Sequence, residues 1–285
     1  MKDGKYLNAA AREYLVPKAY NAALRAGATI LNVYRHREDY NIDLKEDLSP
    51  VTEADRQAHA VIRDYLGPTH VPLLSEEGRE MRFDERRDWD MFWLVDPLDG
   101  TREFIKGNNE FTVNIALLVN SRPVVGVIYV PYFEKVYFCE KGHGSFMKTC
   151  IAPDPAAEFS YEDVFAGAVR LPLRRERNVP LRIAVSRSHR NEDTDRYVAA
   201  LRERYPDAEI VEQGSSYKFC MLAEGRVDYY ARTTGTYEWD TAAGEVILSE
   251  AGGTTKSLPD LDKFAYNKES LLNPWFVCRS GQFQE

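Results

Sequence analysis

Two aspartates that could bind a cation stand close together after a short apolar run. In the segment WLVDPLDGTREF, residues 93–104, Asp96 follows the apolar residues directly and Asp99 stands three positions later. The proline between them interrupts regular strand pairing and the glycine after them permits a sharp turn, so the segment predicts a strand that ends in a tight turn. Carboxylates this close repel each other unless a positive charge lies between them. With the backbone carbonyl of Leu98 they would form an oxygen-only cluster, which suits a hard cation such as Mg²⁺.

An alternative for these two acids stays open. Asp, Pro and Gly are the residues that turns use, so Asp96 and Asp99 could merely cap a turn and the helix that follows it. That helix is predicted at residues 101–107, TREFIKG, and the free N–H groups of its first turn could hold phosphate oxygens.

Three further acids stand where predicted elements begin or end. Glu76 follows the apolar strand of LLSEEG, Asp240 opens the helix DTAAGEVILSEAGG, and Asp47 lies in the loop EDLSPVT. Such ends are where a rigid scaffold can direct side chains to a common point. Taken singly, Glu76 also fits a solvated loop and Asp240 fits an N-cap.

The elements that must position these acids alternate between helix and strand. Helical spacing of apolar residues predicts helices at 8–34 (one long or two consecutive), 52–67, 193–206, 217–225 and 240–253. Apolar or alternating runs predict strands at 71–78, 91–100, 111–120, 181–189, 208–216 and 227–232, with more inside 123–147. The polar, irregular stretch 149–180 predicts a boundary between an N-terminal lobe, 1–150, and a C-terminal lobe, 151–285. Mixed elements in both halves indicate an α/β (α+β) protein of stacked layers.

Composition and net charge limit which partners and which cellular location the protein can have. A formal net charge of −8 argues against a nucleic-acid polymer as partner, whereas an anionic small molecule stays compatible because bound metal ions can outweigh local carboxylates. The 4 cysteines form no CxxC pair, which favours reduced thiols. No signal peptide is recognisable, and no run approaches the roughly 18 apolar residues that span a bilayer. We therefore expect a cytoplasmic protein, with peripheral association with the inner membrane face also compatible.

Three motifs taken together resemble the inositol monophosphatase superfamily. They are LSEE, WLVDPLDGTREF and EWDTAAGEVILSEAGG, and the match runs in order over nearly the whole chain. Within that superfamily, four further segments are similar to those of the bacterial CysQ-type 3′(2′),5′-bisphosphate nucleotidases of sulfur metabolism. These segments are DLSPVTEAD, EFTVNIAL, VSRSH and GSSYKFC. Plain inositol monophosphatases usually lack the EFTVNIAL and GSSxKFC segments. The resemblance implies a layered α-β-α-β-α sandwich of the inositol monophosphatase and fructose-1,6-bisphosphatase type.

The resemblance also implies an activity. The chain would remove the 3′-phosphate of adenosine 3′,5′-bisphosphate (PAP) to give AMP, and would convert the 5′-phosphosulfate analogue PAPS to APS, by attack of a water activated by two or three Mg²⁺ ions. An inositol or sugar-phosphate phosphatase is the alternative, and an inactive phosphate-binding regulator is a remote one. Inhibition by Li⁺ is expected. A monomer and a homodimer both stay open.

Individual roles follow from the same resemblance. The implied metal ligands are Glu76, Asp96, the Leu98 carbonyl, Asp99 and Asp240. The implied catalytic residues are Thr101, which orients and deprotonates the water with Asp47, and Glu76. The implied substrate-binding residues are Gly100, Thr101, Ser186, Ser188, His189, Gly214, Ser215, Ser216, Lys218, Arg232 and Asp240. Tyr230 fits either stacking on a base or a strand core. Two departures, Tyr217 in place of the usual leucine and a missing proline in ARTTGTYEWD, are expected near the base and sugar pocket.

Overall fold

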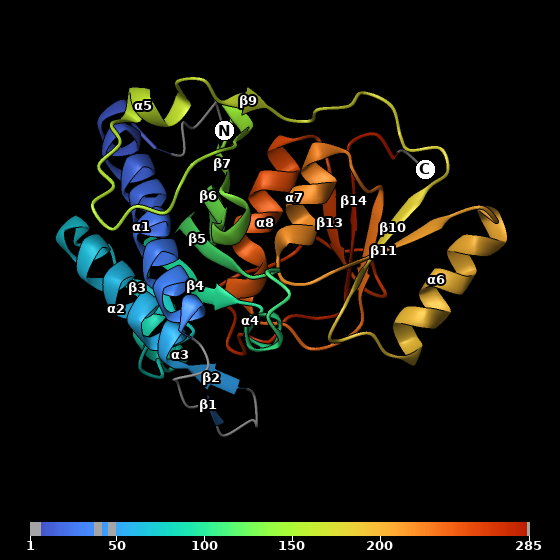
Figure 1. Ribbon diagram of the computed structural model, residues 1–285, viewed down its shortest axis with the longest axis horizontal. Coiled ribbons are helices and arrows are strands. Elements are labelled where there is room, and N and C mark those ends of the chain that lie inside the picture. Colours follow the sequence, from blue (N-terminus) through green and yellow to red (C-terminus); the bar gives the residue numbers. More distant parts are fainter. Residues whose placement is uncertain (1–6, 37–41, 45–49, 284–285) are drawn as a thin grey trace.

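The computed structural model describes residues 7–36, 42–44 and 50–283, which form alternating layers of helix and sheet (Figure 1). A 7-stranded sheet has the order β3-β4-β5-β6-β7-β8-β9. Its strands are Leu73–Ser75, Met91–Asp99, Thr112–Val119, Arg122–Val130, Lys135–Glu140, Gly144–Lys148 and Val169–Arg170. Only β3 and β4 pair in parallel within this sheet; the other neighbours are antiparallel.

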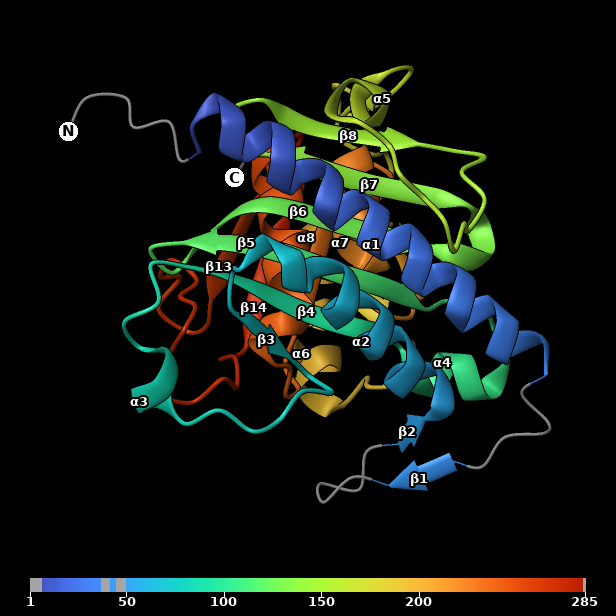
Figure 2. The same cartoon turned by 90° about the vertical axis from the view of Figure 1, so that its left-hand side faces the viewer.

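Two long helices cover one face of this sheet. Figure 2 shows α1 (Ala9–Arg35) and α2 (Glu53–Leu66) lying across the strands. The expected helix at 8–34 is therefore a single one, with Pro17 inside it. The helix expected at 52–67 has Thr52 as its N-cap, and Asp55 completes its capping box.

The opposite face of the same sheet packs against α7 (Tyr217–Glu224) and α8 (Glu238–Glu250). Side chains alternate along β4 because successive residues of a strand point to opposite faces. Trp93 therefore packs in the core beneath α1 and α2, whereas Phe92 and Leu94 pack in the core beneath α7 and α8.

A second sheet lies beyond α7 and α8. It has 5 strands in the order β11-β10-β12-β14-β13. They are Glu209–Gln213, Arg182–Ser186, Tyr229–Arg232, Phe276–Arg279 and Thr254–Ser257. α6 (Glu192–Arg204) covers the far face through Val198. The layers therefore follow the order helix, sheet, helix, sheet, helix, which confirms the expected sandwich (Figure 1).

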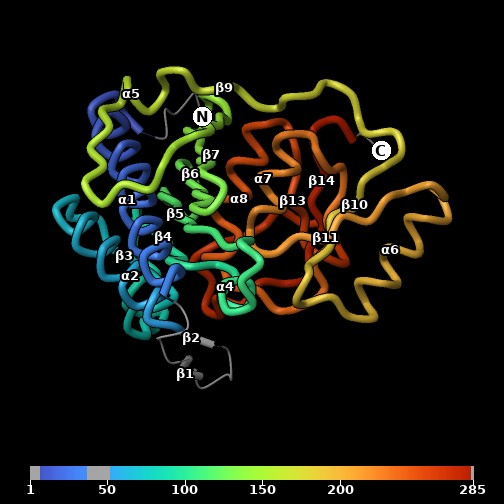
Figure 3. The backbone as a smooth tube through the Cα atoms, viewed as in Figure 1, coloured from blue at the N-terminus to red at the C-terminus, as the bar shows by residue number. Residues whose placement is uncertain are grey.

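The polar stretch 149–180 is divided between the two halves of the fold. Its short helix α5 (Tyr161–Phe165) packs through Val164 into the core beneath α1, and β9 extends the first sheet. After β9 the backbone runs across to β10 in the second sheet (Figure 3). The division into lobes at residue 150 stays a prediction.

The remaining elements are short. They are β1 (Ile42–Leu44), β2 (Pro50–Thr52), α3 (Phe83–Arg86), α4 (Thr101–Lys106) and the 3₁₀ turns Gly67–Thr69 and Pro131–Phe133. Within the described ranges, no helix is long and apolar enough to cross a membrane.

Candidate active site

The parallel pairing of β3 and β4 places two acids side by side. Ser75 is in register with Val95, so Glu76 and Asp96 follow at the same level of adjacent strands. The Glu76 amide N–H donates to the carbonyl of Val95 at 3.1 Å, which fixes the end of β3 against β4. The two carboxyl groups lie in hydrogen-bonding contact with each other.

A bulge in β4 then reorients the chain. Asp96 pairs with Asn114 and Asp99 with Thr112, so the two residues between the aspartates face a single residue of β5. The predicted interruption at the proline is thus confirmed, although pairing resumes at Asp99. The bulge is closed by the Leu98 N–H, which donates to Asp96 Oδ1 at 3.0 Å. Gly100 follows with φ +93°, a conformation that favours glycine.

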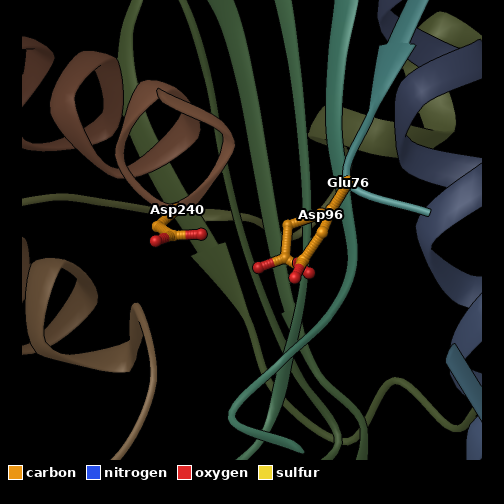
Figure 4. A group of neighbouring side chains, drawn as sticks. All are labelled: Glu76, Asp96 and Asp240. Carbon is orange, nitrogen blue, oxygen red and sulfur yellow. The ribbon is translucent and has the colours of Figure 1, made fainter. Parts of the chain in front are cut away.

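The third acid comes from the first turn of α8. Asp240 is the third residue of α8 and not its N-cap, which is Tyr237. Its Oδ2 atom accepts the Tyr237 N–H at 2.8 Å, as the third helical residue of a capping box does. The positive end of the helix dipole favours a carboxylate at this position. Ligand oxygens of Glu76, Asp96 and Asp240 all lie within 4.8 Å of one another, and Figure 4 shows their carboxylates facing a common space.

Asp99 lines the same cavity but lies apart from that group of three. Its Oδ2 atom accepts a hydrogen bond from the Ser216 N–H, and the Asn114 side-chain nitrogen lies 3.5 Å from the same oxygen. Asp99 therefore joins the acid cluster to the segment that precedes α7.

The electrostatics of the cluster favour a bound cation. Burial raises the pKa of Asp96 well above its usual value, and the charges of Glu76, Asp99 and Asp240 raise it further. Burial, Asp99 and Glu76 raise the pKa of Asp240 in the same way. A cation among these oxygens would offset both the desolvation and the repulsion. Carboxylate and carbonyl oxygens are the ligands that Mg²⁺ takes, so this donor set fits a divalent metal ion.

Thr101, the first residue of α4, stands beside the cluster. Its hydroxyl donates to Asp55 Oδ1 at 3.1 Å and lies 3.4 Å from the Leu98 carbonyl. The other oxygen of Asp55 accepts both the N–H and the hydroxyl of Thr52, at 2.7 and 2.6 Å. The predicted partner of Thr101, Asp47, lies outside the described residues.

Cationic groups form the other side of the cavity, whose volume is about 250 Å³. The Lys218 ammonium is buried and donates to the carbonyls of Gln213 at 3.0 Å and Ser215 at 2.6 Å. Burial and the charge of Arg232 lower the pKa of Lys218 to about 8. Burial lowers the pKa of His189 to about 3, with Arg232 the largest charge contribution, so its ring is neutral. The buried Nε of Arg232 has no hydrogen-bond partner in the described chain.

The cavity collects most of the residues expected to bind substrate. Those that line it are Gly100, Thr101, Ser186, His189, Ser215, Ser216, Lys218, Arg232 and Asp240. Ser188 and Gly214 are not among the lining residues: the Ser188 hydroxyl accepts from Lys106 at 3.2 Å, and the Gly214 N–H donates to Glu110 at 2.7 Å. Tyr230 lines the cavity and packs edge-on against Phe276, which fits the strand-core interpretation; its stacking on a base stays a prediction.

Sequence reasoning missed some residues and misplaced one. Arg102, next to Thr101, lines the cavity, and Asp55 accepts the Thr101 hydroxyl, although neither residue was expected at the site. Tyr217 was expected near the base pocket, but its hydroxyl accepts from Arg226 at 3.1 Å and contacts Lys135 at 3.4 Å, away from the cavity lining. The segment with the missing proline does reach the cavity, through residues 235–237.

Comparisons with known proteins agree on one family. The sequence profile of the inositol monophosphatase family matches residues 11–274. The 3′(2′),5′-bisphosphate nucleotidase CysQ of Shigella flexneri is 37% identical over 256 residues, which is 89% of this chain and 95% of that protein. The crystal structure of CysQ from Bacteroides thetaiotaomicron is 42% identical with a TM-score of 0.85, covering 95% of this chain and 98% of that one. The extragenic suppressor protein SuhB from Bartonella henselae is 26% identical with a TM-score of 0.71, covering 94% of each chain.

Proposed function

This chain belongs to the inositol monophosphatase family, and we propose that it is a Mg²⁺-dependent 3′(2′),5′-bisphosphate nucleotidase. It removes the 3′-phosphate of adenosine 3′,5′-bisphosphate to give AMP, and acts likewise on PAPS to give APS. The observation that carries this proposal is the two-sided cavity, in which an acid cluster faces a cationic wall. A substrate with two phosphates would contact both the metal ions held by the acid cluster and the cationic wall. A substrate with one phosphate would contact only the metal ions.

Five groups would hold the metal ions. They are the carboxylates of Glu76, Asp96, Asp99 and Asp240 and the carbonyl of Leu98. When bound, two or three Mg²⁺ ions would neutralise the phosphate and lower the pKa of a water. A phosphate monoester needs such neutralisation because its own negative charge opposes hydroxide attack.

The Thr101–Asp55 pair orients the attacking water. The Thr101 hydroxyl donates to the Asp55 carboxylate, which leaves its lone pairs free to accept a hydrogen bond from water. Two hydrogen bonds from Thr52 hold that carboxylate in place. Burial raises the pKa of Asp55 to about 6, so near neutral pH the group is ionised and can accept a proton. Asp47 stays a predicted second acid near the water.

The cationic wall takes the second phosphate. Lys218 and Arg232 supply charge, and the neutral ring of His189 supplies a hydrogen-bonding nitrogen. The face of Tyr230 lies near the Lys218 ammonium, 5.2 Å from its ring centroid, and borders the space for sugar and base. Water attack at the 3′-phosphorus breaks the P–O3′ bond, and the 3′-oxygen leaves as a hydroxyl after taking a proton.

Parallel phosphate-release assays test the proposal. With Mg²⁺ present, adenosine 3′,5′-bisphosphate should give a kcat/KM at least about 100-fold above that of inositol 1-phosphate, because binding its second phosphate with two charge-assisted contacts is worth a few kcal/mol. Arg232→Gln should lower kcat/KM for the bisphosphate while leaving hydrolysis of adenosine 3′-monophosphate nearly unchanged. Faster turnover of inositol 1-phosphate would overturn the assigned substrate. Absence of phosphate release from all three compounds would overturn the assignment of the chain as a phosphatase. We also expect inhibition by millimolar Li⁺.

A further inference from the structure

An ion pair between the two sheets joins three of the motifs that set this sequence apart. Arg187 of VSRSH donates to Glu110 of EFTVNIAL through Nε and Nη2, each at 2.8 Å. Gly214 of GSSYKFC donates its backbone N–H to the same Glu110 carboxylate at 2.7 Å. We call Glu110 and Arg187 the brace. Such a bidentate pair fixes orientation as well as distance.

The brace connects elements that are far apart in the sequence. Glu110 lies just before β5 of the first sheet, whereas Arg187 and Gly214 follow the adjacent parallel strands β10 and β11 of the second. Arg187 also donates to the backbone carbonyl of Glu212 at 2.9 Å. Only 13% of the Glu110 side chain and 37% of the Arg187 side chain are exposed, so the pair is partly shielded from water. One arginine thus ties the start of the loop 213–216 to the first sheet.

The loop 213–216 has little freedom to move toward the first sheet. A Cβ built on Gly214 would lie 2.4 Å from Cγ of Glu103 and 3.1 Å from Cβ of Glu110. A Cβ built on Gly100 would lie 3.3 Å from Cβ of Ser215. The two glycines therefore let the loop and the turn after β4 approach closely.

The braced loop holds one group on each side of the cavity. On the acid side, the Ser216 N–H donates to Asp99, and the Ser216 hydroxyl donates to Asn114 at 2.7 Å. On the cationic side, the carbonyls of Gln213 and Ser215 accept from the Lys218 ammonium. A shift of this loop would move both groups at once.

We propose that the brace is a positioning element that fixes Asp99 toward the metal cluster and Lys218 toward the second phosphate. Neither brace residue lines the cavity, so both act through the loop 213–216. The part that concerns the second phosphate rests on the proposed function; the part that concerns metal binding does not.

The test compares three brace variants with a matched control. The variants are Glu110→Gln, Arg187→Gln and Arg187→Lys, the last of which keeps the charge but loses the fork. The control is Arg182→Gln, which removes the 3.1 Å ion pair with Glu209 that also joins β10 to β11 but lies away from the loop. Each variant is measured for its thermal midpoint, for Mn²⁺ affinity by electron paramagnetic resonance without substrate, and for kcat and KM.

We expect Glu110→Gln and Arg187→Gln to weaken Mn²⁺ binding by about 10-fold, as loss of a group that orients a metal ligand does. KM for adenosine 3′,5′-bisphosphate should rise more than for adenosine 3′-monophosphate. The Mn²⁺ affinity and the KM of Arg187→Lys should lie between those of the two glutamine variants and those of the parent. Both values for Arg182→Gln should match the parent. The double variant Glu110→Gln/Arg187→Gln should bind Mn²⁺ no more weakly than either single variant, because each single change already removes the same ion pair.

Parental Mn²⁺ affinity in folded Glu110→Gln and Arg187→Gln proteins would overturn the proposal. An equal loss of Mn²⁺ affinity in Arg182→Gln would also overturn it, since a general weakening of the second sheet would then explain the weaker metal binding. If either glutamine variant fails to fold, Arg187→Lys decides by the same Mn²⁺ criterion. If the chain hydrolyses no substrate, the proposed function fails while the Mn²⁺ measurement still decides the role of the brace.

Discussion

Asp96 and Asp99 lie three positions apart, yet their carboxylates have different surroundings. Asp96 faces Glu76 and Asp240 in the acid cluster, whereas Asp99 accepts the Ser216 N–H at the edge of the second sheet. The bulge in β4 produces this difference, because it changes the register between the two residues. At the scale of single residues, the site is therefore defined by which partner each carboxylate meets.

Asp55→Asn tests the assignment of the acid that assists Thr101. Losing the negative charge should lower kcat by about 10²- to 10⁴-fold, the usual contribution of general base catalysis. The fold should persist because asparagine can retain the capping contacts to Thr52. Steady-state kinetics and thermal midpoints of Asp55→Asn, Thr101→Val and Asp47→Asn provide the check. A large loss in Asp47→Asn with near-parental activity in Asp55→Asn would reverse the assignment.

Asp96→Asn tests the repulsion within the cluster. Burial and like charges raise the pKa of Asp96 in the folded chain, so folding favours its protonated form. Stability from this group is complete below the unfolded pKa and is lost as pH rises toward the folded one. In the presence of a chelator, the parent should therefore lose more free energy of unfolding between pH 5 and pH 8 than Asp96→Asn does. Urea unfolding measures this, with the exposed Asp88→Asn as control; identical slopes in parent and Asp96→Asn would contradict the prediction.

Sequence predicted the types of residue at the site better than their partners. The acids and Thr101 stand in motifs at element ends, and such ends can be found from apolar patterns. The pairing of Thr101 with Asp55 crosses 46 positions. Nothing local distinguishes an aspartate that only caps a helix from one that also accepts a second hydroxyl. The contact between Tyr217 and Arg226 was missed for a similar reason, because the direction of a helical side chain depends on where the helix packs.

Among the elements, α8 connects the acid cluster to the packing of the first sheet. It supplies Asp240 from its first turn and packs along the first sheet, with Ala243 against Gly126 of β6. Most helices and central strands were predictable because their apolar residues recur regularly. β13 and β14 were not predicted; β13 reads TTKS, which has no apolar pattern.

Gly126→Ala tests how closely α8 must pack. A Cβ at this position would lie 2.7 Å from the Ala243 carbonyl oxygen and 2.7 Å from the Val246 side chain, so the helix must shift. We expect a loss of about 1–3 kcal/mol in the free energy of unfolding, as overpacking of a core causes. Because Asp240 moves with the helix, kcat should fall as well.

Gly67→Ala is the matched control for Gly126→Ala. Gly67 has φ −50°, and a Cβ added there would have no atom within 4 Å beyond its chain neighbours, so no packing contact opposes alanine. Its effect should stay within about 1 kcal/mol of zero, because the lower entropy of the unfolded chain offsets the reluctance of a residue before Pro68 to be helical. Equal destabilisation by the two changes, measured by urea unfolding, would contradict the packing explanation.

The whole molecule places one cavity between two sheets that share a central helical layer. The first sheet contributes Glu76, Asp96 and Asp99, and the second contributes Arg232 at the end of β12. The layered class was predictable from the order of helical and strand patterns. The meeting of the two sheets at one cavity was predictable only through the resemblance to a family, because long-range packing leaves no periodic signal in the sequence.

Anomalous diffraction from crystals soaked in Mn²⁺, which replaces Mg²⁺ at oxygen sites, tests most directly whether the acid cluster is a metal centre. We predict at least two anomalous peaks in the cavity, each within about 2.5 Å of oxygens from the group Glu76, Asp96, Leu98, Asp99 and Asp240. Well-diffracting soaked crystals without a peak among these oxygens, or with Mn²⁺ bound only elsewhere, would contradict the claim that this cluster is a metal centre.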